Sequence, residues 1–391
     1  MSATAGFTIA AQNLAAPTAG RASVPALTTR KVDGHEWDAV ISRFDGVCQE
    51  QLHAFAAIRW PGVTPEPRLF ERQGRFVGGA LVMVQRLPLG LASIAIIKWG
   101  PMLADAKAAD AAATYAGMME ALVAEYAVER GMMLSVLPHA APGERNDEYH
   151  ALRARGFKRG AVLRFPDRYL VNLRLSDEAQ RKSFDQTWRR QLNKSEKSEL
   201  SFEHAGAERI DEFKTLYAAM SDRKQFPDYS AFDTLDALMA LDEPLRPELF
   251  FVRHAGEVVY GALIFKAGQR AVYLYGASND QALPLRAGYF MHWHIIRWLR
   301  DHTNASWYDL GGTDGFQGLH QFKKGMVGAE GVIRPVPPVA NYAHRPLAYM
   351  LGAGAFGARE LYNELRRRVE MVRPSRARPD QPPASLPADL Q

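Results

Sequence analysis

The same order of predicted elements occurs twice along this chain of 391 residues. Each copy consists of a hairpin, a strand, a helix, a strand and a short helix, and residue identity between the copies is low. A repeated order of elements without a repeated sequence indicates one α/β unit duplicated in tandem. In the first copy the patterns predict a hairpin at 71–86, strands at Leu91–Trp99 and Met132–Leu137, helices at Lys107–Arg130 and Glu148–Arg155, and a further strand at Phe157–Leu173.

The second copy begins after residue 175, where two helices precede the repeated order. Its predicted elements are helices at Ser176–Ser198 and Ala207–Ser221, a hairpin of Leu249–Arg253 and Val258–Ala267, strands at Arg270–Tyr275 and Ser306–Leu310, and helices at Arg286–His302 and Gly318–Gly325. We therefore predict an α/β (α+β) chain with two tandem domains at 35–175 and 176–345. Each is expected to be a mixed sheet flanked by helices.

Both ends of the chain differ from these domains. Residues 1–34 are rich in Ala, Thr and Ser and lack the features of a secretory signal, so we expect a flexible tail. In 346–391 a helix at Arg345–Val369 precedes a segment with five prolines, from Arg373, which cannot form a packed core. We expect the apolar stripe of the helix to dock on its own protein. The alternative is a membrane surface, with the basic run at 366–368 (Arg366, Arg367 and Arg368) on lipid phosphate.

Composition excludes several classes of protein. With 47 % hydrophobic residues the chain can bury real cores, which excludes wholesale disorder and collagen-like structure. No apolar window reaches the length of a membrane span. The single cysteine, Cys48, makes an internal disulfide or a thiolate zinc site impossible and fits a reducing compartment; we expect it to be a small buried apolar residue. A net charge of +5 is a mild bias toward anionic partners.

Familiar catalytic templates are absent from the sequence. It contains no Gly-x-Ser-x-Gly elbow, no phosphate-binding Gly-x-x-x-x-Gly-Lys-Ser/Thr loop and no His-Glu-x-x-His. His292 and His294 lie two residues apart on a predicted helix, so their side chains point in different directions. We expect no metal site.

The most distinctive stretch runs from Trp307 to Gly328. A predicted strand ends in Asp309, two glycines follow, and a short helix carries Phe322, Lys323 and Lys324. Ligands of α/β sheets bind at strand ends. Asp309 could accept a proton or hold an amine there, while either lysine could neutralise an anionic oxygen, as acyl transfer to an amine requires. The structural alternative is that Asp309 caps the turn, Phe322 is core and the lysines are solvated.

This stretch resembles the C-terminal signature of the Fem-type aminoacyltransferases (FemABX), a branch of the GNAT-like acyltransferases. The resemblance rests on Tyr308-Asp-Leu-Gly-Gly followed by Gly-Leu-His-Gln-Phe-Lys-Lys-Gly-Met. It extends to Trp99-Gly-Pro-Met-Leu, Leu134-Ser-Val-Leu-Pro and Leu152-Arg-Ala-Arg-Gly-Phe of the first domain, and thus over roughly residues 40 to 345. The family fold, two GNAT-like domains, agrees with the duplication.

The resemblance implies a transferase that moves an acyl or aminoacyl group onto an amine without a metal. Family members add amino acids from aminoacyl-tRNA to the peptide of peptidoglycan precursors, bound in a cleft of the first domain and between the domains. By position, Lys323 after Phe322 matches the family's active-site lysine, and Asp309 matches its strand-end acid. Bridge-forming members carry a long helical arm, for which Ser176–Ser221 is too short.

A basic helix opening the second domain also resembles the family. Trp188-Arg-Arg-Gln-Leu-Asn-Lys places Arg189, Arg190 and Lys194 on a candidate phosphate-binding face, although such charged runs are commonly just solvated. GNAT acetyltransferases bind the CoA pyrophosphate at the start of the central helix. Here that position reads Leu283-Pro-Leu-Arg-Ala-Gly-Tyr-Phe, with Arg286 present but different glycine spacing. The donor, aminoacyl-tRNA or acyl-CoA, therefore stays open, and no tightly bound cofactor is expected.

Three functions remain open at this point. The first is an aminoacyl- or N-acyltransferase acting on a phosphate-bearing cell-envelope precursor. The second is a CoA-dependent N- or O-acyltransferase of polysaccharide or lipid assembly, and the third is a non-catalytic GNAT-like module that binds an anionic ligand. For the first we expect a cytoplasmic monomer at the inner face of the membrane, with the C-terminal helix as a candidate for peripheral contact and Arg189, Arg190, Lys194, Arg286 and Lys324 as substrate-binding residues.

Overall fold

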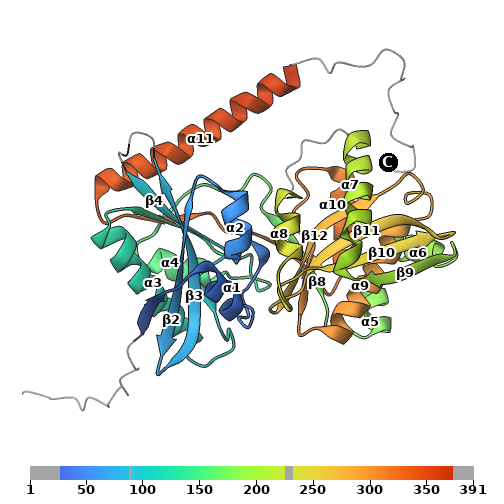
Figure 1. Ribbon diagram of the computed structural model, residues 1–391, viewed down its shortest axis with the longest axis horizontal. Helices are drawn as coiled ribbons and strands as arrows, with labels where there is room; N and C mark the ends of the chain where they lie inside the picture. The colour runs from blue at the N-terminus through green and yellow to red at the C-terminus, as the bar shows by residue number, and fades with distance from the viewer. Residues whose placement is uncertain (1–26, 88–89, 91, 225–231, 373–391) are drawn as a thin grey trace, which may run out of the picture.

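The computed structural model describes residues 27–87, 90, 92–224 and 232–372, except for the side chains of residues 360 and 362–372. Two mixed sheets lie side by side, each flanked by helices (Figure 1). The predicted fold class, two tandem α/β units, is confirmed.

The first sheet has the order β1-β2-β3-β4-β6-β15-β7, and β5 pairs with β3. Its strands are β1 (Thr28–Lys31), β2 (Thr64–Arg72), β3 (Arg75–Arg86), β4 (Ser93–Lys98), β5 (Met102–Leu103), β6 (Met133–Leu137), β7 (Lys158–Arg159) and β15 (Ala340–Tyr342).

The second sheet has the order β14-β8-β13-β12-β11-β10-β9. Its strands are β8 (Asp167–Asn172), β9 (Leu200–Ala205), β10 (Glu248–His254), β11 (Glu257–Phe265), β12 (Arg270–Ser278), β13 (Trp307–Asp309) and β14 (Val332–Pro335). The β10–β11 hairpin turns at Ala255 and Gly256, both with positive φ. Gly256 adopts this backbone without strain because it has no Cβ.

In the part of the chain that the structure describes, each domain contains one parallel strand pair joined by a helical crossover. In the first domain β4 pairs with β6 through α3 (Ala111–Leu122), which continues as a π-helical segment at Val123–Glu129. In the second domain β12 pairs with β13 through α9 (Ala287–His302). Parallel strands require such a crossover, so the duplicated sequence pattern produces a duplicated β-α-β unit.

The two domains exchange strands, which shifts the boundaries expected from the sequence. β8 falls within the expected first domain, 35–175, but pairs with β13 in the second sheet. β15 falls within 176–345 but pairs with β6 in the first sheet, and β1, expected in the tail, pairs with β2. The predicted strand Phe157–Leu173 is divided because Gly160 and Pro166 separate β7 from β8.

The predicted helix Ser176–Ser198 consists of two helices, α5 (Asp177–Ser183) and α6 (Gln186–Ser195). Phe184 has extended backbone and a buried side chain, and the Asp185 side chain accepts from the backbone N–H of Thr187, which caps α6. The other helices are α1 (Gly34–Ile41), α2 (His53–Arg59), α4 (Asp147–Ala154), α7 (Ile210–Lys224), α8 (Leu235–Met239), α10 (Gln317–Val327) and α11 (Pro346–Val372), with 3-10 turns at Gln49–Gln51, Ala207–Arg209 and Phe232–Thr234.

The C-terminal helix α11 docks at its start on the first domain and then runs away from it (Figure 1). Gly352 packs against Met133 of β6, whereas Leu347 and Met350 are exposed. The side chains of the basic run at 366–368 lie outside the described residues. Within the described part of the chain, no helix has both the length and the apolar character needed to cross a membrane.

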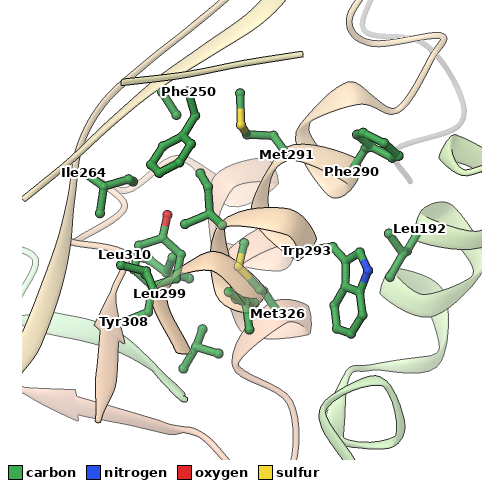
Figure 2. Close-up of a cluster of buried hydrophobic side chains, with 14 of the residues drawn as sticks. Leu192, Phe250, Ile264, Phe290, Met291, Trp293, Leu299, Tyr308, Leu310 and Met326 are labelled. Carbon is green, nitrogen blue, oxygen red and sulfur yellow. The ribbon is translucent and has the colours of Figure 1, made fainter. Parts of the chain in front are cut away.

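The core of the second domain holds the strand end and helix of the distinctive motif in place. Tyr308 and Leu310 of the β13 region pack with Met291 of α9 and Met326 of α10 (Figure 2). A separate apolar cluster spans both domains, since Phe44 and Leu52 of the first pack in one cluster with Leu238, Phe265 and Val272 of the second. The domains therefore share a buried apolar interface.

Candidate active site

Asp309 lies at the end of β13 and is almost fully buried, at 1 % exposure. Its Oδ2 atom accepts from Arg168 of β8, with Nη2 at 3.0 Å and Nε at 3.3 Å, and lies 3.5 Å from Nη1 of Arg270 of β12. Its Oδ1 atom accepts from the backbone N–H of Gly311 at 2.9 Å. Because β13 lies between β8 and β12, the acid sits between arginines from both neighbouring strands.

The charges around Asp309 keep it ionised. Burial alone would raise the pKa of Asp309, but Arg168, Arg270 and the Gly311 N–H hold it below the usual value. A carboxylate with a lowered pKa and two cationic partners is a poor proton acceptor at neutral pH. The group is suited to holding the turn and the arginines in place.

Lys323 approaches the same turn from α10. Its Nζ atom donates to the backbone carbonyls of Leu310 at 2.5 Å and Gly312 at 2.6 Å, and the side chain is 5 % exposed. Burial, with a contribution from Arg168, lowers the pKa of Lys323 to about 8. An ammonium group has three donors, so two hold the turn and the third is left for another oxygen.

A small cavity of about 80 Å³ opens beside Asp309 between the two domains. The second domain contributes Arg168, Arg270, Val272 and Asp309, and the first contributes Cys48, Gln49, Glu50, Trp99, His139 and Ala140. The Trp99 and His139 rings lie 5.6 Å apart. Burial lowers the pKa of His139 to about 3, so this ring is neutral at physiological pH.

The other predicted residues lie away from this cavity. Phe322 packs with Tyr289, His292 and Trp188 beside the core of the second domain, and Lys324 is exposed. Arg286 lies at the start of α9 in a left-handed conformation, φ 56°, and donates to the carbonyl of Leu283.

The basic residues of α6 form a separate surface. Arg189, Arg190 and Lys194 line a hollow along α6 together with Gln186, Thr187, Asn193 and Lys197. The Asp185 N–H donates to the carbonyl of Gly325, which joins the start of α6 to α10. The structure thus brings Asp309 and Lys323 to the same turn, whereas the basic residues of α6 line a separate hollow.

Comparison with known proteins identifies the fold. Residues 182–324 match the model of the acetyltransferase (GNAT) domain. The crystal structure of FemX superposes with a TM-score of 0.66 at 17 % identity, covering 83 % of this chain and all of FemX. A conserved protein of unknown function from Bacteroides thetaiotaomicron superposes at 0.54 and 11 % identity, covering 81 % of this chain and 98 % of that one.

A sequence match points in the same direction. The lipid II:glycine glycyltransferase of Staphylococcus aureus is 36 % identical over 76 residues, which is 18 % of this chain and 18 % of that protein. The chain thus matches about a fifth of the length of this curated relative. The predicted resemblance to the FemABX-type, GNAT-like family is confirmed.

Several residues of this candidate site were not predicted from the sequence. Arg168 is 141 residues from Asp309 in the chain, and only the pairing of β8 with β13 brings them together. The available signal for it was an arginine directly before the apolar run Tyr-Leu-Val of β8. Trp99 follows β4 in the Trp-Gly-Pro element and was noted only for the resemblance.

The cysteine and histidines are located as the sequence suggested. Cys48 is buried, and burial raises the pKa of its thiol to about 12, so the thiol is neutral. It borders the cavity between the domains. His292 contacts the Tyr308 hydroxyl at 3.0 Å, whereas His294 stacks on Phe202, so the two rings do not share a site. Among the described residues, no group of three or more His, Cys, Asp or Glu could hold a metal ion.

Proposed function

We propose that this protein is an acyltransferase that forms an amide on an amine of a peptidoglycan-precursor-like molecule, with an aminoacyl ester as donor. The observation that carries the proposal is Lys323, a nearly buried cation held by the backbone carbonyls of Leu310 and Gly312, in the turn that directly follows Asp309. Asp309 itself lines the cavity between the two GNAT-like domains. The names of the similar proteins, FemX and the lipid II:glycine glycyltransferase, support this chemistry.

The reaction needs stabilisation of one developing charge. The amine nitrogen attacks the acyl carbonyl carbon, a C–N bond forms, and the carbonyl oxygen becomes an oxyanion. The remaining N–H of Lys323 donates to this oxygen, in a buried setting where such a bond is strong. The C–O bond of the ester then breaks, and the leaving alkoxide takes the proton released by the amine. The products are an amide and an alcohol, and no base with a raised pKa is required.

Asp309 acts in this scheme as a positioning residue. It binds the N–H of Gly311, the residue between the two carbonyl groups that hold Lys323. The acid therefore orients the lysine through the turn, and it holds Arg168 and Arg270 along the wall of the cavity. These arginines would neutralise a carboxylate or phosphate of the acceptor.

The basic surface of α6 is the proposed contact for a phosphate-bearing precursor. Arg189, Arg190 and Lys194 are close enough in sequence to face one ligand, and Arg286 and Lys324 extend the positive charge along α9 and α10. A monomer is sufficient for this arrangement, since both domains contribute to the cavity. For a lipid-linked acceptor, Leu347 and Met350, both exposed on α11, would face the membrane.

A CoA-dependent N- or O-acyltransferase is the second candidate, because the GNAT domain match points to acyl-CoA-type donors in general. The start of α9, where GNAT acetyltransferases bind the pyrophosphate, carries Arg286 here. Calorimetry with acetyl-CoA distinguishes the two donors. A dissociation constant for acetyl-CoA in the micromolar range, together with acetyl transfer, would favour CoA as the donor.

The proposed function is tested with the purified full chain, a UDP-linked muropeptide acceptor and an aminoacylated tRNA. Mass spectrometry of the acceptor reads amide formation. We expect transfer by the wild type and a loss of roughly 100-fold or more for Lys323→Ala, the range for removal of an oxyanion donor. Lys107→Ala, which removes an exposed lysine of the first domain, is the control and should retain activity. Full activity of Lys323→Ala would refute the assignment of the lysine, and absence of turnover with any acyl donor would favour the non-catalytic binding module.

A further inference from the structure

A hollow of about 230 Å³ lies on the first domain, where the C-terminal helix α11 begins. β7, β15 and the start of α11 form its walls. Its lining includes Lys158, Asn341, His344, Pro346, Tyr349 and Met350. None of these residues lines the cavity beside Asp309, so the hollow is separate from the candidate active site. It has room for several water molecules or for a group of the size of phosphate.

The lining of this hollow suits an anion. Lys158 is exposed, and its Nζ atom lies over the Tyr349 ring at 4.7 Å from the ring centre, which holds the ammonium group against α11. His344 is a second exposed basic group, and the lining contains no acidic residue among the described residues. Pro346 begins α11, and the first turn of a long helix presents unpaired backbone N–H groups that favour phosphate.

A buried amide in the lining lacks a hydrogen-bond partner. Asn341 of β15 is 3 % exposed, and its Oδ1 atom has no partner among the described residues. Buried amide groups of folded proteins are nearly always satisfied by protein, by ordered water or by a ligand. Since Asn341 lines the hollow, the amide and the start of α11 point independently to a polar ligand at the same place.

An apolar surface continues from the hollow along α11. We call it the outer face of α11, formed by Leu347, Met350 and Leu361, which are 65 %, 69 % and 61 % exposed. Met350 and Leu361 are 11 residues apart, which is about three helical turns, and Leu347 precedes Met350 by about one turn. The three side chains therefore lie along one side of the helix. Met350 also lines the hollow, so the two surfaces are continuous.

The contact of α11 with the first domain uses the other side of the helix. Ala348 and Gly352 are buried, and Gly352 packs against Met133 of β6. The helix then continues away from the domain (Figure 1). Gly354 and Ala358, which are exposed on the outer face, add no polar side chain to it. An apolar face of this kind on the solvent side of a helix indicates an interaction surface.

We propose that the hollow and the outer face of α11 together bind the surface of a bilayer that contains anionic phospholipid. A lipid phosphate occupies the hollow beside Lys158, and the outer face lies among the upper parts of the acyl chains. A helix with one apolar face and cations beside it binds in the plane of the membrane interface in this way.

A bilayer fits this site better than a second copy of the chain does, because a lipid offers a phosphate and apolar chains side by side. The proposal extends the membrane-facing role of Leu347 and Met350 to a defined phospholipid site. It goes beyond the proposed function and does not depend on acyl transfer.

Vesicle flotation of the full chain at one fixed salt concentration tests the contact. The vesicles contain phosphatidylcholine alone or phosphatidylcholine with phosphatidylglycerol, and we expect tighter binding of the wild type to the latter. Lys158→Gln should weaken this binding roughly 5-fold, the effect of one cation near an anionic surface. Met350→Gln combined with Leu361→Gln should weaken it by roughly 10-fold or more, since two large apolar side chains are withdrawn from the acyl chains.

Matched controls separate this site from general changes in charge or exposed apolar surface. Leu283→Gln removes an apolar side chain of the second domain that is 59 % exposed, and Lys107→Gln removes an exposed lysine of the first domain. Both should bind the vesicles as the wild type does. Asn341→Asp adds a negative charge to the hollow at constant shape and should weaken binding to the phosphatidylglycerol vesicles. Circular dichroism of each variant checks folding.

A dye attached to the outer face reports its surroundings directly. The single cysteine of the chain, Cys48, is only 7 % exposed, so Leu361→Cys supplies an accessible thiol for an environment-sensitive dye such as NBD. We expect the NBD emission of this variant to shift to the blue and to rise when phosphatidylglycerol vesicles are added. The same dye on Leu283→Cys should show neither change.

Four results would overturn the proposal. The wild type fails to float with phosphatidylglycerol vesicles, or the Met350→Gln and Leu361→Gln variant floats as the wild type does, or Lys158→Gln leaves binding unchanged, or the dye on Leu361→Cys does not respond to vesicles. A wild-type dimer that the Met350→Gln and Leu361→Gln variant no longer forms would assign the outer face to a second copy instead. None of these measurements uses acyl transfer, so a failure of the proposed function and a failure of the membrane site are distinguishable.

Discussion

The burial of Lys323 predicts a specific pH dependence of stability. Its side chain is 5 % exposed, and its Nζ atom contacts the carbonyls of Leu310 and Gly312. Burial lowers its pKa from 10.5 to about 8. One pKa unit corresponds to about 1.4 kcal/mol, so the free energy of unfolding should differ by about 3 kcal/mol between low pH, where Lys323 is protonated in both states, and high pH, where it is neutral in both. The perturbation that isolates this effect is Lys323→Met, which keeps an unbranched side chain only one atom shorter and removes the titrating group.

The direction of this pH dependence follows from the number of protons bound by the folded and unfolded chains. Because the folded chain releases the Lys323 proton near pH 8 and the unfolded chain near pH 10.5, the unfolded state binds more protons between these values. The burial of Lys323 therefore does not lower the free energy of unfolding above about pH 10.5, where the group is neutral in both states. This free energy falls as the pH decreases from about 10.5 to about 8, and the loss is complete below about 8. Relative to Lys323→Met, the free energy of unfolding of the wild type should rise by about 2 kcal/mol from pH 7 to about pH 9.5.

Urea denaturation followed by tryptophan fluorescence measures this difference at both pH values in one buffer composition. Lys324→Met is the matched control, because it removes one lysine from the adjacent exposed position of α10. A wild-type-minus-variant difference that stays constant between the two pH values would refute the burial argument. A difference that falls with rising pH would show that Lys323 is held by a carboxylate instead of by carbonyl groups.

Two further predictions concern the same turn. Asp309→Asn leaves Arg168 and Arg270 without their shared anion. Because both arginines are partly exposed, we expect the free energy of unfolding to fall by about 3 kcal/mol, the low end for a broken buried ion pair, as measured by urea denaturation. An unchanged free energy of unfolding would show that the ion pair contributes nothing to stability. The second concerns the rate of acyl transfer, which should fall as pH rises through about 8 because Lys323 loses its proton there. Lys323→Arg should move this fall to higher pH, and a wild-type rate that stays level to about pH 9.5 would exclude the protonated lysine as the oxyanion donor.

Most of the fold was predictable because it depends on local patterns. The periodicity of Arg286–His302 corresponds to α9, and the turn at Ala255-Gly256 joins β10 to β11. The exchange of β8 and β15 was not predictable, because short strands such as Ala340–Tyr342 carry little signal and their pairing is decided by the sheet edges available to them. The division of α5 from α6 depends on where the Phe184 ring packs, which is a tertiary effect.

The candidate site was predictable to the extent that it lies within one motif. Asp309 and Lys323 are 14 residues apart, and a strand, a glycine turn and a helix between them bring their side chains to one place. The role of Asp309 was not predictable, since a lone strand-end acid is compatible with a base, and only Arg168 and Arg270 show that its charge is already compensated. Phe322 could not be assigned from its neighbour, because adjacent residues of a helix face different directions.

The duplication itself explains why the cavity lies between the domains. Trp99 directly follows β4 and His139 follows β6, so both lie at the carboxyl ends of the parallel pair of the first domain. Asp309 lies at the carboxyl end of β13, in the parallel pair of the second domain. Ligands of open α/β sheets bind beyond the carboxyl ends of the strands. In this chain the carboxyl ends of the two duplicated units meet across one cavity of about 80 Å³, and the exchanged strand β8 carries Arg168 into it. Neither domain alone therefore holds the complete set of cavity residues, so the proposed transfer activity should require both.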